Sequence, residues 1–184
     1  MNVKLVQVKA DEKDILYRLL QFALYDGSFY INNELNDYGI FEYKYFDDYF
    51  TDSTRDKYFI KFEEKLVGFV LINENNKFNQ TGKTIAEFLI IPNFRRHHIG
   101  KKAAILSFEQ YPGNWEVQPM ENNTGAYNFW EKVIYEYTNG NYEVKNDKNE
   151  NVFIFNNKIL NKWIYWIILL LIKPKRGSLC ITYY

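Results

Sequence analysis

The feature that most limits how this chain can fold is a short, strongly apolar segment, Ile85 to Ile91, which runs directly into Pro92. Glu87 is the only acidic residue within it. A run that is apolar on both faces is typical of a strand buried in the middle of a sheet, and a proline after it favours the end of the strand. We therefore expect a central sheet that is covered on both faces. Strand alternation places Glu87 and Leu89 on one face and Phe88 on the other.

The segment that follows carries positive charge into the start of a helix. Apolar residues recur with helical spacing from about Ile99 onward, and four basic residues lie close to this point: Arg95, Arg96, Lys101 and Lys102. The first turn of a helix has unpaired N–H groups, and the helix dipole favours an anion there. Gly100 would let a phosphate approach the backbone closely. The pattern fits a pyrophosphate site, and a solvated basic turn at a helix start is the alternative.

Elsewhere the sequence predicts a mixed α/β domain. Alternating or apolar runs between turn residues predict further strands at 3–8, 58–62, 66–72, 115–117, 142–145 and 151–155. Helical spacing predicts a helix capped by Asp11 and another capped by Asn122 or Asn123, with a short helix near residues 45–50. This order of elements indicates one domain that covers residues 1–157.

Composition excludes several classes of function. The 23 basic and 23 acidic residues give a net charge of zero, and no second basic stripe accompanies the helix start, so nucleic-acid binding is not expected. The single cysteine, Cys180, cannot form an internal disulfide, and no Cys/His spacing indicates a metal site. The first residues lack the apolar run of a signal peptide, so a cytoplasmic location is expected.

The last segment, residues 158–184, has a different character. Ten apolar residues, Trp163 to Ile172, are followed by basic residues. A membrane-spanning helix needs about 20 apolar residues, so spanning is not expected. The run could be a segment covered by the domain or by a partner, an anchor that lies on a membrane surface, or a tail that is not native to the domain.

Two motifs resemble those of the GCN5-related N-acetyltransferase (GNAT) family. The sequence RRHHIGKKAA resembles the motif R-x-x-G-x-G/A, with Arg95 first, Gly100 as the second glycine and His98 in place of the first. The sequence NTGAYNFW, from Asn123 to Trp130, resembles the later motif N-x-x-A-x-x-[F/L]-[Y/W]. The phrase YPGNWEV at 111–117 is similar to a bacterial branch of predicted acetyltransferases.

The resemblance implies a fold and a cofactor. The fold is α/β, with a mostly antiparallel sheet of about six or seven strands, about four helices, and a splayed gap beside strand 85–91. The cofactor is acetyl-CoA, whose pantetheine arm would pair with the backbone of Phe88, Leu89 and Ile90. Amides of the loop would hold its pyrophosphate after Arg95: Arg96, His97, His98, Ile99, Gly100 and Lys101. Asn123 and Trp130 would contact the cofactor from the later helix.

Catalysis of amide formation needs a base, because the amine must be neutral before it attacks the thioester. Family members often place a base in the strand that holds Glu87, so Glu87 is the candidate, and the alternative is a glutamate paired with lysine or facing solvent. Trp130 stands where many relatives have a tyrosine that protonates the thiolate, and indole does not ionise usefully. Tyr127, one turn earlier, is the candidate substitute, and solvent or the thiolate itself is the alternative.

The sequence thus predicts an N-acetyltransferase that acts on a primary amine of a small molecule or peptide. The irregular acidic and aromatic stretch at residues 25–55 is expected to select the acceptor. The alternative is a module that binds CoA without catalysis, favoured by Trp130 and His98. The sequence leaves open whether the protein forms a homodimer.

Overall fold

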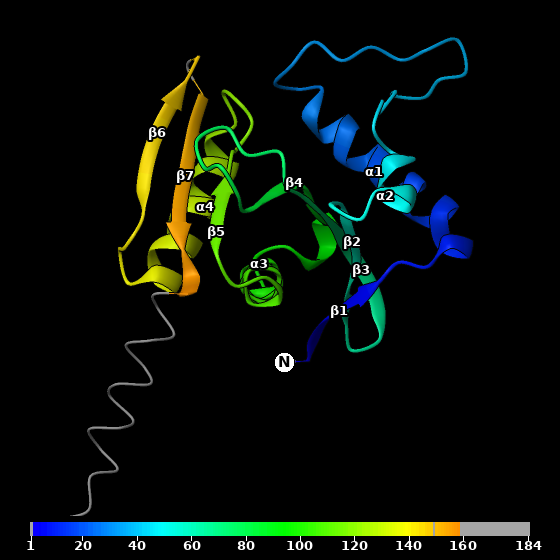
Figure 1. Cartoon of the computed structure of the whole chain (residues 1–184). Coiled ribbons are helices and arrows are strands. Elements are labelled where there is room, and N and C mark those ends of the chain that lie inside the picture. Colours follow the sequence, from blue (N-terminus) through cyan, green and yellow to red (C-terminus); the bar gives the residue numbers. More distant parts are fainter. Residues whose placement is uncertain (1, 149, 159–184) are drawn as a thin grey trace, which may run out of the picture.

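The computed structural model describes residues 2–148 and 150–158, in which seven strands form one sheet in the order β1-β2-β3-β4-β5-β7-β6 (Figure 1). All neighbouring strands are antiparallel except β4 and β5, which are parallel. The expected mixed, mostly antiparallel sheet is thereby confirmed, and the apolar strand β4 lies in its middle. The strands are β1 Val3–Gln7, β2 Asp56–Phe62, β3 Lys65–Asn73, β4 Lys83–Ile90, β5 Asn114–Val117, β6 Glu143–Asp147 and β7 Glu150–Asn156.

Four α-helices cover the two faces of the sheet. The helices α1 and α2 pack on one face, where Leu16 and Tyr49 contact the core that includes Leu89. The helices α3 and α4 pack on the other face, through residues such as Phe108 and Trp130. The helices are α1 Lys13–Gly27, α2 Asp48–Thr51, α3 Ile99–Gln110 and α4 Thr124–Thr138, with 3-10 turns η1 Ala10–Glu12 and η2 Pro92–Phe94.

The start of α1 differs from the sequence prediction. Asp11 lies inside η1 and does not cap the helix. The Glu12 carboxylate instead accepts a hydrogen bond from the Lys9 N–H at 3.0 Å. Asp11 was therefore a wrong choice of cap, because the 3-10 turn moves the first helical residue to Lys13. Asn123 is the cap of α4, since its side-chain oxygen accepts from the Ala126 N–H.

A β-bulge changes which residues of β4 share a face. Leu71 of β3 lies opposite Glu87, but the next residue, Ile72, lies opposite Ile85, so Ala86 is an extra residue on β4. Glu87 and Leu89 still share the α1 and α2 face, as alternation predicted. Ile85, however, packs with the core on the opposite face. The bulge thus interrupts the alternation of β4, so that Ile85 and Glu87 face opposite sides of the sheet although they are two residues apart.

The sheet opens between its two central strands. β4 pairs with β5 only over Lys83–Ile85 and Trp115–Val117, whereas its pairing with β3 continues to Ile90. Among the described residues, no strand therefore lies beside this edge of β4 beyond Ile85. This is the splayed gap that the family resemblance implied.

The loop between β3 and β4, residues 74–82, is held to β5 by a buried carboxylate. Glu116 is 1% exposed, and its oxygens accept hydrogen bonds from three consecutive backbone N–H groups at 2.6–3.0 Å, those of Lys77, Phe78 and Asn79. Hydrogen bonds to a charged acceptor are among the stronger ones in proteins. The loop is therefore fixed to the sheet through the same strand that borders the gap.

Gly68 allows the close approach of β3 to β4. A Cβ atom at Gly68 would lie 1.9 Å from the backbone oxygen of Leu89, a distance that no side chain tolerates. We expect Gly68→Ala to destabilise the fold by at least about 2 kcal/mol, because the backbone of β4 must move. Gly125→Ala is the matched control, since its Cβ would meet its nearest neighbour, Asn123 Oδ1, at 3.5 Å, and alanine is the better helix former. Urea unfolding of both variants checks this, and equal midpoints would contradict it.

We propose that the domain ends at Asn157. This residue is 2% exposed, and its side chain donates to the Phe108 oxygen at 2.7 Å and accepts from the Gly113 N–H at 2.6 Å. The apolar run Trp163 to Ile172 lies outside the described residues. Within the described part, no helix has the length and apolar character needed to cross a membrane.

Removal of residues 158–184 is therefore expected to leave a folded domain. All seven strands and the Asn157 hydrogen bonds precede the cut, so the melting temperature should stay within a few degrees of that of the full chain. Circular dichroism and thermal melting of both proteins measure this. A truncated protein that fails to fold would place the apolar run in the core, and a full chain that needs detergent for solubility would indicate a surface anchor.

Candidate functional site

The open edge of β4 presents backbone groups from alternate residues. The Ile91 N–H donates to the Val67 oxygen of β3 at 2.9 Å, so the backbone groups of Leu89, two residues earlier, also point toward β3. The groups of Phe88 and Ile90 point the other way, into the gap beside β5. Of the three residues predicted from sequence, two therefore have backbone groups that face the gap, and the Ile90 oxygen there already accepts a hydrogen bond from Arg95 Nε.

The loop between η2 and α3 has the geometry of an anion site. Arg96 and His98 both have left-handed backbone conformations, with φ of 63° and 58°. Glycine adopts this conformation easily, and here His98 adopts it at the position where the family motif has glycine. The first helical hydrogen bond runs from the Lys102 N–H to the His98 oxygen. Within the described residues, the backbone N–H groups from Arg96 to Lys101 have no backbone partner, which leaves them available to a phosphate.

Two basic side chains of this loop are already engaged. Arg95 donates through Nε to the Ile90 oxygen at 2.7 Å and through Nη2 to Asp26 at 2.6 Å. Lys101 forms an ion pair with Glu136 of α4. Arg95 and Lys101 thus connect the loop to β4, α1 and α4.

Aromatic side chains pack between the loop at the start of α3 and the gap beside β4. A Cβ atom at Gly100 would lie 3.3 Å from the Phe129 ring, so this glycine also allows α3 to approach α4. The Phe129 ring stacks on Phe88 with ring centroids 5.9 Å apart. Trp130 is 6% exposed and packs edge-on against Phe88. Trp130 is thus mainly a core residue beneath the gap.

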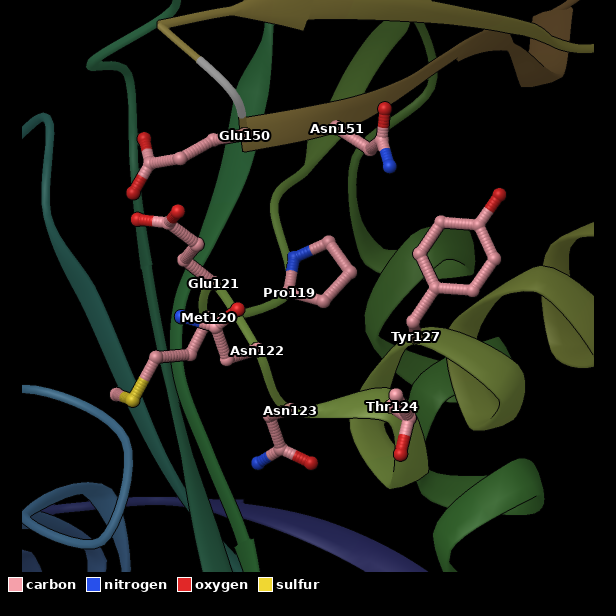
Figure 2. Close-up of a pocket in the computed structure, with 9 residues that line it drawn as sticks. All are labelled: Pro119, Met120, Glu121, Asn122, Asn123, Thr124, Tyr127, Glu150 and Asn151. Carbon is pink, nitrogen blue, oxygen red and sulfur yellow. The ribbon is translucent and has the colours of Figure 1, made fainter.

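A pocket of about 260 Å³ lies at the start of α4, between the β5–α4 loop and β7 (Figure 2). Asn123 and Tyr127 line it, and Figure 2 shows Glu121 and Glu150 on the side away from Tyr127. The amide nitrogen of Asn123 makes no hydrogen bond within the described residues, whereas its oxygen caps α4. The carboxylates and amides that line the pocket suit a polar or cationic ligand.

The structure does not bring Tyr127 and Glu87 together. The Tyr127 hydroxyl donates to Glu131 at 3.4 Å, and its ring packs on Phe153 of β7. It therefore belongs to the α3 and α4 face, whereas Glu87 belongs to the opposite face. Burial and the neighbouring Glu131 raise the pKa of Tyr127, which keeps the hydroxyl protonated at neutral pH.

The surroundings of Glu87 favour the protonated form of its carboxyl group over the charged form. Its side chain is half-buried and has no ion pair or hydrogen bond within the described residues, so the alternative of a lysine pair is not found. Burial raises the pKa of Glu87 from 4.5 to about 7. Burial, and then the charge of Glu87, raise the pKa of Tyr43, which places this hydroxyl near the carboxylate. Sequence reasoning missed Tyr43, because tyrosine is too frequent in this chain for one to stand out.

Metal binding finds no support in the described part of the chain, where no group of three or more His, Cys, Asp or Glu side chains is placed to hold an ion.

Comparison with known proteins gives the family. The model of the acetyltransferase (GNAT) family matches residues 17–134. An acetyltransferase from Thermus thermophilus is similar in structure, with a TM-score of 0.62, 15% identity, and coverage of 85% of this chain and 97% of the other. So is the PaiA N-acetyltransferase from Thermoplasma acidophilum in complex with coenzyme A, with a TM-score of 0.56, 10% identity, and coverage of 85% and 99%.

The aminoglycoside acetyltransferase AAC(6')-Ib, in complex with coenzyme A, has a TM-score of 0.60 at 10% identity, with coverage of 88% of this chain and 98% of the other. A comparison with curated protein sequences found no match. At these identities the solved structures establish the fold, while the family model covers more than half of the chain. The chain therefore belongs to the GNAT family of acetyltransferases.

Proposed function

We propose that this protein transfers the acetyl group of acetyl-CoA to a primary amine. The observation that carries the proposal is an edge of β4 that no strand of the described part pairs with, next to a helix start whose first N–H groups have no backbone partner there. The backbone of Phe88 and the N–H of Ile90 would pair with the pantetheine arm, and the amides from Arg96 to Lys101 would hold the pyrophosphate. Asn123 would donate its free amide to the cofactor from α4.

Glu87 is proposed as the general base. An amine arrives as an ammonium ion at neutral pH, and the Glu87 carboxylate accepts one proton from it, directly or through water. The neutral nitrogen then attacks the thioester carbon, and the tetrahedral intermediate collapses with cleavage of the C–S bond. The nitrogen must lose a second proton to become an amide. This proton passes to the leaving thiolate, which becomes the thiol of CoA, or to solvent. The direction of the Tyr127 hydroxyl, toward Glu131, favours these routes over donation by Tyr127.

The acceptor is proposed to be a cationic small molecule or peptide. Glu121 on the rim of the pocket, together with acidic residues of the α1–α2 loop, favours a positively charged ligand, whereas the charge of Glu150 is already paired with Lys77.

A CoA-binding module without catalysis is the second candidate. It is favoured by Trp130, which occupies the family's tyrosine position and is buried in the core. Release of free thiol from acetyl-CoA in the presence of a panel of amines separates the two functions, since only an enzyme releases it continuously.

Acetyl-CoA is expected to raise the melting temperature. A ligand present at a hundredfold excess over its dissociation constant stabilises by about 2.7 kcal/mol, which corresponds to about 5–10 °C for a chain of this length. Gly100→Asp should abolish the shift, because it places a carboxylate against the pyrophosphate. Gly100→Ala controls for crowding against Phe129 and should keep part of the shift. An unchanged shift in Gly100→Asp would place the cofactor elsewhere.

Replacement of Glu87 by glutamine is expected to lower kcat at least about a hundredfold while acetyl-CoA binding is retained. Wild-type kcat should fall as pH drops through about 7, because the base becomes protonated. The variant should lose this acidic limb and recover partly at high pH, where more of the amine arrives neutral. Glu109→Gln on the exposed surface of α3 is the matched control. Turnover of Glu87→Gln within a few-fold of wild type would remove Glu87 as the base without affecting the cofactor site.

The same pKa makes a prediction about stability. The folded-state pKa of Glu87 lies above the unfolded value, so its protonated form is favoured on folding. Wild-type stability is therefore highest below pH 4.5, where Glu87 is protonated in both states, and it falls as pH rises toward about 7, because the folded state then has to bury a charged carboxylate. Glutamine does not ionise, so Glu87→Gln does not lose stability in this way. The difference in melting temperature, variant minus wild type, should therefore increase between pH 4.5 and about 7. A constant difference between pH 4.5 and pH 8 would contradict the assigned pKa.

A further inference from the structure

The last turn of α1 contacts both sides of the proposed cofactor gap. On one side lies the loop of residues 95–98 between η2 and α3, called the phosphate loop here after its proposed role, where the carboxylate of Asp26 accepts from Arg95 at 2.6 Å. On the side of the β5–α4 loop, Gly27 lies against Met120, whose terminal carbon would be 3.0 Å from a Cβ atom at Gly27. Two consecutive residues of α1 therefore connect the two loops that border the gap.

Arg95 links the phosphate loop to the end of β4 as well. Its Nε donates to the Ile90 oxygen, which points into the gap, while its Nη2 donates to Asp26. A guanidinium is planar and presents its donors in a fixed arrangement, so the position of one hydrogen bond fixes the direction of the other. The Asp26 carboxylate therefore sets the orientation in which Arg95 meets Ile90.

We propose that Asp26 is a positioning residue for acetyl-CoA binding, which acts by holding Arg95 in the orientation that ties the phosphate loop to the end of β4. The inference rests on the proposed use of acetyl-CoA. Asp26 itself belongs to neither of the proposed cofactor-binding backbone segments. It holds the N–H groups that follow Arg95 in place before the cofactor arrives, which lowers the cost of ordering them on binding.

The sign of the effect distinguishes this role from simple electrostatics. A carboxylate near a phosphate site repels the cofactor, so if Asp26 acted only through its charge, Asp26→Asn would tighten binding. If Arg95 were free to bind phosphate directly, removal of its carboxylate partner would also tighten binding. Positioning predicts the opposite: Asp26→Asn weakens acetyl-CoA binding, although it removes a negative charge.

The experiment measures the dissociation constant of acetyl-CoA by calorimetry with the full chain. We expect Asp26→Asn to weaken binding about fivefold, as for loss of a half-exposed charged pair, and Asp26→Glu to restore most of the affinity. Asp37→Asn removes the same charge from the loop that follows α1 and should leave the affinity within about twofold. Arg95→Lys should weaken binding, and the double variant Asp26→Asn with Arg95→Lys should be no weaker than Arg95→Lys alone, because both changes break the same link.

Each outcome supports or overturns the inference. Equal or tighter binding by Asp26→Asn overturns it, as does an additive double variant. Melting temperatures measured without ligand ensure that each variant is folded at the temperature of the titration. Failure of the wild-type protein to bind acetyl-CoA would instead overturn the proposed function, so the two failures are distinguishable.

Discussion

The short parallel contact between β4 and β5 is the constraint on which the rest of the structure depends. Parallel pairing over only three residues holds the two halves of the sheet together, and beyond it the strands part. The bulge at Ala86 lies at the point where this pairing stops, and it turns Glu87 toward the α1 and α2 face while Phe88 faces α3 and α4. In the proposed reaction, adjacent residues of one strand would therefore supply the backbone edge for acetyl-CoA and the carboxylate that faces the acceptor.

Much of this arrangement was predictable from the sequence, because the signals are local. The apolar run before Pro92 predicted the central strand β4, and the apolar spacing from Ile99 onward predicted the start of α3, both within one short segment. The spacing of apolar residues after Asn123 predicted α4, and the asparagine is indeed its cap. The family match and the seven-stranded sheet confirm the fold that these motifs implied.

The rest depends on contacts between residues far apart in the chain, which no local pattern reports. Asp26 and Arg95 meet only because the end of α1 crosses the phosphate loop, and Tyr43 lies near Glu87 only because the α1–α2 loop folds over β4. The bulge was hidden because a strand that is apolar on both faces shows no break in alternation when one residue is added. Asp11 failed as a predicted cap because a 3-10 turn and the Glu12 carboxylate take its place at the start of the helix.

The buried carboxylate of Glu116 restrains one of the surface loops beside the gap. Because it binds three consecutive amides of the β3–β4 loop, that loop moves with β5 and is unsuited to open or close over a bound acceptor. On the opposite side of the gap, Gln21 of α1 anchors the chain again at Phe41 through two hydrogen bonds, which leaves residues 28–40 between two fixed points. Slow opening measured by hydrogen exchange should therefore concentrate in this one segment, and the rate at which acceptors enter and leave would be a property of its hinge residues and not of the sheet.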